Sequence, residues 1–312
     1  MVLLLQYMLL FASVLALVAL GGCFSEHSGI INLGLEGIMV VGALGGALVL
    51  KYMPVDVPSF ITVIVTLIGA IAFGMLYSAL LGVAAIHFNA DQTLIGTAMN
   101  MLATAVSAVI VKSINLSADS SDVSSVVYYI DNRPDLTVQI GGFEFNWFML
   151  VAVVAVVAAY VVLYKTRFGL RLMACGENPQ AANSVGIDVF KMRWAGVLIS
   201  GMLGGLGGIA YITAGSSWTF ENGVAGYGFL ALAVMIFGQW KPHRIALAAL
   251  LFGFFRSLGS VYSGIPLLAS MNIPSTVYNL LPYIISLIVL AFSSKNSMAP
   301  KAEGIPYDKS TR

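Results

Sequence analysis

Apolar runs without a charged side chain recur along almost the whole of this sequence. The first run, residues 1–22, contains no Asp, Glu, Lys or Arg. A helix needs about 20 apolar residues to cross the roughly 30 Å hydrocarbon core of a bilayer. Charged residues make up only 9% of the chain, whereas a water-soluble domain carries about 25%. Because so few charges cannot cover a water-facing surface, we predict a membrane protein.

Nine segments have the length and apolar character of membrane-crossing helices. We therefore predict an all-α polytopic fold in which residues 1–312 form a single transmembrane domain. The segment 227–240 is short, so we expect a half-helix or a re-entrant piece there. Such a backbone is tolerated at membrane depth where it is buried in protein or lines a wet cavity. The nine segments are 3–22, 30–50, 59–87, 92–112, 146–164, 194–214, 227–240, 245–264 and 275–293.

Basic residues are concentrated in three segments, which are 165–193, 241–244 and the tail 294–312. With nine spans, these segments lie on one side of the membrane, and the positive-inside rule makes that side cytoplasmic. The loop 113–146 contains five acidic residues and a single Arg, and it then faces outward. We therefore expect an external N-terminus and a cytoplasmic C-terminus.

Several classes of function lack their sequence signals. A net charge of +1 and the absence of a long basic run argue against nucleic acid as a partner. Cys23 and Cys175 do not have the spacing of a zinc site, and the three histidines are scattered. We therefore expect no metal, no cofactor and no catalytic cluster. No Walker A sequence is present, so we do not expect this chain to bind ATP itself.

The stretch FSEHSGIINLGLEGIMVVGAL, residues 24–44, places polar side chains between two apolar runs. We expect Glu26 and His27 to lie in a short turn between spans. Asn32 and Glu36 fall within the second span and, being four residues apart, share a helix face. A charged residue at a helix centre costs about 2.5–3.5 kcal/mol on insertion scales. The pair therefore either lines a substrate cavity near mid-depth or hydrogen-bonds to neighbouring spans.

Two other polar residues lie inside predicted spans. Asn100, in GTAMNMLATA, fits either a hydrogen bond between helices or a contact with a cavity. Arg256 lies in the middle of LFGFFRSLGS, and a buried guanidinium needs a carboxylate or carbonyl partner. Glu36 is one candidate partner for Arg256.

Aromatic residues gather in the stretch GSSWTFENGVAGYGF, residues 215–229, which the predicted topology places on the external side. Trp218, Phe220 and Tyr227 fit an interfacial aromatic belt, because such rings collect at the membrane surface. They equally fit a flat ligand with polar edges that enters from outside. Both interpretations stay open at this point.

Glycines in ISGMLGGLGGIAY, residues 199–211, do not fit a nucleotide-binding loop, because such a loop needs a strand before it. Pairs such as Gly204/Gly208 and Gly42/Gly46 have the four-residue spacing that lets helices approach closely in a membrane. We therefore interpret these glycines as packing residues.

The segment KTRFGLRLMACGENPQAANSVGIDVFKMRW, residues 165–194, is too polar to span a membrane and too long for a turn. It can form a short helix, because Asn178 suits the N-cap, Pro179 suits the first helical position and Gly186 suits the end. Such a helix is either a simple connector or a surface that another protein binds.

This segment contains the motif GLRLMACGENPQAANSVGID, which resembles the cytoplasmic loop of ABC-importer permeases of the branched-chain amino acid and simple-sugar type. The motifs SGIINLGLEGIMVVGA and GYGFLALAVMIFGQWKP resemble the nucleoside-importing branch of that family. The resemblance covers about residues 10–294, with the three motifs in the same order. The additional N-terminal span of the sugar permeases is absent from this sequence, as expected for the nucleoside branch.

The resemblance implies a permease subunit of the bacterial cell membrane that imports nucleosides by alternating access. Its implied partners are a second, paralogous permease, a cytoplasmic ATPase that binds ATP and Mg²⁺, and an external lipoprotein that captures the substrate. Ala182→Glu is then expected to uncouple ATP hydrolysis from transport while leaving the fold intact. The positions that fall in the family's coupling helix are Glu177, Asn178, Pro179, Ala181, Ala182, Gly186 and Ile187. The positions that fall near its translocation path are Asn32, Glu36 and Asn100, to which we add Trp218, Phe220 and Tyr227 as candidate substrate contacts.

Three other classes of protein give different expectations. An ion-coupled secondary transporter could use the same buried polar residues, but its uptake would collapse with an ionophore rather than with ATP depletion. A channel is disfavoured, because the sequence has neither a carbonyl-filter motif nor a charged ring. A membrane enzyme is disfavoured by the lack of a catalytic cluster.

Overall fold

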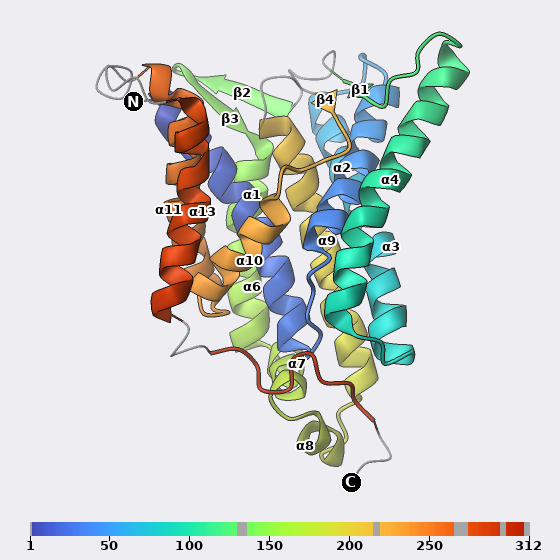
Figure 1. Cartoon of the computed structure of the whole chain (residues 1–312), viewed down its shortest axis with the longest axis vertical. Helices are drawn as coiled ribbons and strands as arrows, with labels where there is room; N and C mark the ends of the chain where they lie inside the picture. The colour runs from blue at the N-terminus through green and yellow to red at the C-terminus, as the bar shows by residue number, and fades with distance from the viewer. Residues whose placement is uncertain (1, 130–135, 215–218, 265–273, 294–297, 309–312) are drawn as a thin grey trace.

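The computed structural model describes the chain except residues 1, 130–135, 215–218, 265–273, 294–297 and 309–312. Most helices run along the long axis of the molecule (Figure 1). The short helix α8, Pro179–Ser184, lies at one end, which we call the α8 end. Four short strands lie at the opposite end, which we call the hairpin end.

All helices except α7 and α8 follow apolar runs of the sequence, and short strands pair in two small antiparallel sheets. The strand β1, Val127–Tyr128, pairs with β4, Thr219–Phe220, and β2, Thr137–Ile140, pairs with β3, Phe143–Asn146. A π-helical turn, Val83–His87, follows α3, and a short 3-10 helix, Tyr262–Gly264, follows α11. The other helices are α1 Val2–His27, α2 Leu35–Tyr52, α3 Ser59–Gly82, α4 Gln92–Ala118, α6 Trp147–Lys165, α7 Arg167–Glu177, α9 Val189–Ala214, α10 Tyr227–Phe237, α11 Pro242–Val261 and α13 Ser275–Ser293.

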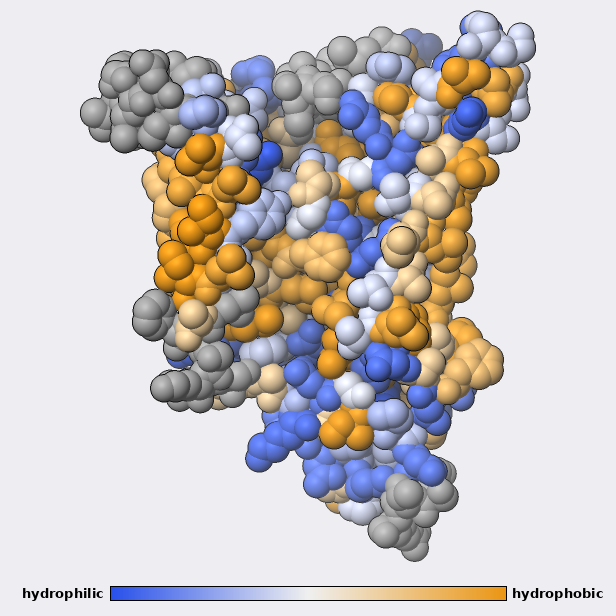
Figure 2. Space-filling model, viewed as in Figure 1, coloured by the Kyte–Doolittle hydropathy of each residue, from blue (hydrophilic) through white to orange (hydrophobic). Residues whose placement is uncertain are grey.

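Each of the nine predicted segments contains a helix. Within the described residues, seven helices are long and apolar enough to cross a membrane, and shorter apolar helices occupy Tyr227–Phe237 and Thr276–Ile288. The fold is mostly helical, although the prediction of an all-α chain missed the two small sheets. Figure 2 shows apolar residues over the flanks at α13 and α4, with polar residues between them and around the α8 end.

Glu26 and His27 do not lie in a turn, so this prediction was wrong. Helix α1 continues through both residues and ends before Gly29, whose φ of +92° breaks the helix. Glu26 is buried, and its carboxylate accepts a hydrogen bond from the indole N–H of Trp240. This bond to the α10–α11 turn explains how a carboxyl can lie inside the packed end of α1.

Helix α9 lies at the centre of the molecule and packs against α1, α2 and α3. Glycines make this packing possible, as the sequence predicted. A Cβ on Gly42 would lie 2.2 Å from Cα of Gly205, and a Cβ on Gly208 would lie 2.0 Å from the carbonyl oxygen of Met39. Any side chain at these positions would therefore force the helix backbones apart.

Two crossings of the molecule begin with a non-helical segment, one from the α8 end and one from the hairpin end. Residues 28–34 are non-helical and lead from the α8 end to the start of α2 near the middle of the molecule (Figure 1). Residues 221–226 are non-helical and lead from the hairpin end to the start of α10, so 227–240 contains the expected half-helix. The N-termini of α2 and α10 consequently meet near the middle of the molecule.

Candidate functional site

Glu36 joins the two broken crossings. It lies in the first turn of α2, and its carboxylate accepts hydrogen bonds from the backbone N–H groups of Gly226 (2.7 Å) and Gly228 (2.6 Å) at the start of α10. Gly226 has a φ of +79°, and a Cβ on Gly228 would lie 2.4 Å from the Glu36 backbone nitrogen. The first N–H groups of a helix carry partial positive charge. One carboxylate therefore neutralises two helix N-termini at once.

Asn32 and Asn100 hold the non-helical segment before α2 in place. Asn32 donates to the hydroxyl of Ser200 (2.9 Å) and accepts from the backbone N–H of Gly34 (3.1 Å). Asn100 accepts from the backbone N–H of Gly37 (2.8 Å) and donates to a carbonyl of the same segment. Of the two roles that the sequence left open, the structure displays hydrogen bonding between helices for both residues.

Arg256 does not pair with Glu36, which was one candidate partner for it. Its Nε donates to the hydroxyl of Tyr227 (2.6 Å), its Nη1 donates to Oδ1 of Asn279, and its Cζ lies 5.1 Å from the centroid of the Phe11 ring. Tyr227 lies between the two glycines that bind Glu36. Arg256 and Glu36 are thus linked through the turn Gly226–Gly228. Glu36 binds backbone N–H groups of this turn, and Arg256 binds the side chain of Tyr227.

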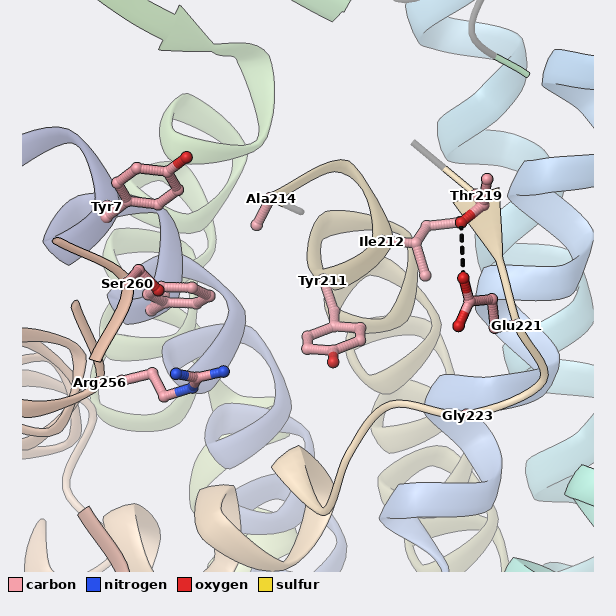
Figure 3. A pocket seen from close by; sticks show the side chains of 10 residues that line it. Tyr7, Tyr211, Ile212, Ala214, Thr219, Glu221, Gly223, Arg256 and Ser260 are labelled. Carbon is pink, nitrogen blue, oxygen red and sulfur yellow. Dashed lines mark hydrogen bonds between the residues drawn. The ribbon is translucent and has the colours of Figure 1, made fainter. Parts of the chain in front are cut away.

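A cavity of about 390 Å³ lies beside this junction, and residues of α1, α9, β4 and α11 line it. The rings of Tyr7, Phe11 and Tyr211 line it, together with Arg256 and Glu221. In Figure 3 the guanidinium and the carboxylate lie on opposite sides of the Tyr211 ring. Among the described residues, the cavity therefore combines aromatic surfaces with one cation and one anion, and these lining residues have no net charge.

The predicted aromatic contacts have different outcomes. Trp218 lies outside the described residues. Phe220 is fully buried in β4, where it pairs with Val127, and it does not line the cavity. Tyr227 is also buried, but its ring centroid lies 4.6 Å from that of Tyr211, so it supports the cavity wall from behind.

Sequence reasoning did not select Tyr7 or Tyr211 as site residues. Tyr7 and Tyr211 are isolated phenols in otherwise apolar runs, which was the available signal. Glu221 lies in the aromatic stretch that was singled out, next to Phe220, and its carboxylate accepts from the hydroxyl of Thr219 (3.2 Å). Tyr7 is distant in the sequence from Tyr211 and Glu221, so only packing reveals that it lies close to them.

The short helix predicted in 165–194 is confirmed as α8. Asn178 caps it, since its Oδ1 accepts from the backbone N–H of Ala181 (3.0 Å), Pro179 occupies the first turn, and Gly186 follows with a φ of +84°. Among the predicted positions, Pro179 and Ile187 are half-buried and Ala182 is buried. Glu177, Asn178, Ala181 and Gly186 are exposed.

Ala182 is only 3% exposed and packs with Cys175, Val189 and Tyr307. A glutamate at this position would place a charge in an apolar contact and displace α8 from the body of the protein. The burial of Ala182 therefore argues against the expectation that such a variant leaves the fold intact. Val185, which is 75% exposed, presents the apolar side chain of this loop to solvent.

Comparison with known proteins identifies the family. The model described as branched-chain amino acid transport system / permease component matches residues 4–291. The chain belongs to this permease family. The permease is 39% identical to the nucleoside ABC transporter permease protein NupC of Lactococcus lactis subsp. cremoris, over 97% of this chain and 96% of NupC. It is also 39% identical to the guanosine ABC transporter permease protein NupQ of Bacillus subtilis, with the same coverage.

A second Lactococcus protein, the nucleoside ABC transporter permease protein NupB, is 22% identical over 96% of this chain and 82% of NupB. NupB and NupC of the same strain are thus both similar to this permease. The permease is a transport subunit of the ABC type and not an enzyme. Its membrane-spanning helices make it a multi-pass protein of the bacterial plasma membrane.

Proposed function

We propose that this permease is one half of an ATP-driven nucleoside importer, with the hairpin end outside and the α8 end in the cytoplasm. The observation that carries the proposal is the aromatic cavity beside the Glu36 junction. The two relatives at 39% identity, which are named for nucleosides and guanosine, support the same substrate class. The basic segments near α8 support the orientation, because positive residues collect on the cytoplasmic side.

The chemistry of the cavity suits an uncharged solute with a flat ring. A nucleobase can stack on Tyr7, Phe11 or Tyr211, and such stacking contributes about 1–3 kcal/mol per base. Glu221 can accept hydrogen bonds from ribose hydroxyls. Arg256 already donates to Tyr227 and Asn279, and Glu36 already occupies the helix N-termini that would otherwise attract an anion. The cavity therefore favours nucleosides over nucleotides.

The α8 end fits the coupling role. In this proposal α8 and the exposed residues around it bind a cytoplasmic ATPase, which holds ATP and Mg²⁺. A second, paralogous permease completes the pore, as the similarity to both NupB and NupC supports, and an external lipoprotein delivers the nucleoside. ATP binding and hydrolysis then supply the differential free energy that shifts the pair between outward-open and inward-open states.

The direct test is to purify the tagged permease with the proteins that accompany it and to reconstitute the complex in vesicles. We expect a second permease and an ATPase in the preparation, and saturable uptake of labelled nucleosides that requires ATP on the α8 side. Uptake that persists without ATP, or that collapses with an ionophore while ATP is present, would contradict the proposal and favour an ion-coupled transporter.

The cavity makes a separate prediction. Tyr211→Leu removes a stacking surface, and a loss of about 1.4 kcal/mol corresponds to a tenfold change in affinity. We expect the half-saturating nucleoside concentration to rise about tenfold, while Tyr211→Phe leaves it within twofold. Tyr160→Leu is the matched control, because Tyr160 lies on α6 away from the cavity. An equal rise of the half-saturating concentration in the Tyr211 and Tyr160 variants would show that the cavity is not part of the substrate path.

A further inference from the structure

The segment 298–308, which we call the C-terminal strap, runs across the α8 end of the molecule (Figure 1). It has little regular secondary structure, but Ala302 and Tyr307 are buried. Its first contact is with the α10–α11 turn, where the backbone N–H of Met298 donates to the side chain of Gln239 (3.1 Å). The strap is therefore a packed element of the fold rather than a solvated tail.

The middle of the strap is bonded to the end of α1 and to α7. The backbone N–H of Gly304 donates to the carbonyl of Gly29 (3.1 Å), and that of Ala302 donates to the carbonyl of Gly176 (2.8 Å). The carboxyl of Glu303 lies close to that of Glu26, and burial raises the pKa of Glu303. Since Glu26 also binds the indole of Trp240, described above, this contact extends to the α10–α11 turn.

The end of the strap is bonded to α8 and α9. Gln180 of α8 donates to the backbone carbonyl of Asp308 (3.0 Å), and Arg193 of α9 donates to the carbonyl of Ile305 (2.9 Å). The ring of Tyr307 packs edge-on against Phe190. It also joins the small apolar cluster that contains Ala182 of α8.

Three polar atoms buried at the strap have no hydrogen-bond partner among the described residues. They are Nε of Arg193, Oε2 of Glu303 and the hydroxyl of Tyr307. A buried polar atom without a partner costs about 1–3 kcal/mol. These unpaired atoms lower the stability of the docked strap. A segment that shifts during a transport cycle is expected to be held in this way.

We propose that the C-terminal strap transmits movement of α8 to the α10–α11 turn. The contacts form a continuous route from Gln180 through Tyr307, Glu303 and Glu26 to Trp240. Helix α10 begins at the Glu36 junction and ends at this turn, so a shift of the turn acts on the junction directly. The strap residues are positioning residues, and the inference rests on the proposed coupling role of α8.

Two substitutions in the full-length complex should unseat the strap. Gly304→Val is incompatible with a φ of +74°, and its Cβ would lie 2.7 Å from Cδ1 of Ile31. Tyr307→Ala removes the ring from the cluster beneath α8. We expect both variants to assemble with the ATPase and hydrolyse ATP, but to transport at least fivefold fewer nucleosides per ATP. Amide hydrogen exchange at Ala302 and Gly304 should become faster.

Two matched controls on the same segment should leave transport per ATP within twofold. Tyr307→Phe keeps the ring and removes a hydroxyl that has no partner among the described residues, and Ile305→Ala changes an exposed side chain. Faster exchange at the strap in Gly304→Val with unchanged transport per ATP would overturn the proposal. If the wild-type complex itself shows no ATP-driven uptake, the proposed function fails instead.

A cross-link separates transmission from simple release. Gln180→Cys combined with Asp308→Cys allows a short thiol cross-linker to tie the strap to α8. The native thiols interfere little, because Cys23 and Cys175 are buried and burial raises the pKa of Cys175 to about 11. We expect uptake to continue after cross-linking, since the strap and α8 move together. Suppose instead that cross-linking with a cleavable linker abolishes uptake and that cleavage of the linker by a reductant restores it. The strap would then have to detach from α8 during transport, which contradicts transmission.

Discussion

Replacing Glu36 by alanine is expected to lower ATP-driven nucleoside uptake more than tenfold. The substitution removes two hydrogen bonds to the backbone of α10, and each bond to a charged acceptor contributes about 1.5–3 kcal/mol. It also leaves the N-termini of α2 and α10 facing each other without a counter-charge. The junction should then lose its defined geometry, so the apparent unfolding temperature of the purified complex should fall as well.

Two further variants show whether the carboxylate itself matters. Glu36→Gln keeps one acceptor oxygen for one of the two N–H groups, so we expect an intermediate loss of uptake. Asp56→Asn is the matched control, because Asp56 is an exposed carboxyl after α2 and should leave uptake unchanged. Wild-type uptake in Glu36→Ala, measured in vesicles with equal amounts of complex, would rule out a role for this junction.

Replacing Val185 by aspartate is expected to abolish most ATP-driven uptake without unfolding the permease. Val185 is 75% exposed at the end of α8, so the substitution leaves the interior unchanged. In the proposed complex this side chain lies against the ATPase, and an unpaired charge buried in that contact is costly. We expect at least tenfold less uptake and weaker recovery of the ATPase with the tagged permease.

The control for this prediction is Val123→Asp at the hairpin end, where the valine is 65% exposed. It introduces the same charge on the opposite side of the membrane and should leave recovery of the ATPase unchanged. Normal uptake and normal ATPase recovery in Val185→Asp would show that α8 does not bind the motor subunit. Ala182→Glu cannot replace this test, because Ala182 is packed inside the loop.

The helices were predictable because each crossing of a bilayer requires a long apolar run, and such runs are visible without any structure. The short run 227–240 likewise indicated the half-helix. The break at 28–34 was not predicted, since Ile30, Ile31 and Leu33 are as apolar as the helix that follows them. Hydropathy reports which residues avoid water, but it does not report whether their backbone is helical or extended.

The site was predictable only where its structure is local. The N-cap Asn178 and the proline at the first position of α8 are adjacent in the sequence, so α8 could be identified from spacing. Glu36 was singled out as costly, but its partners are backbone N–H groups about 190 residues away. Backbone groups have no signature in a sequence, which is why the side chain of Arg256 was considered instead.

The glycine contacts at the centre of the molecule restrict how its helices can move during transport. At Gly42 and Gly205 the backbones of α2 and α9 touch with no side chain between them, so neither helix can rotate without a collision. Gly74 brings α3 equally close to Gly201 of α9. We therefore expect α2, α3 and α9 to tilt together as one rigid unit. In the proposed transport cycle we therefore expect the hinge to lie in the neighbours of these three helices, foremost in the short helix α10, whose start Glu36 binds.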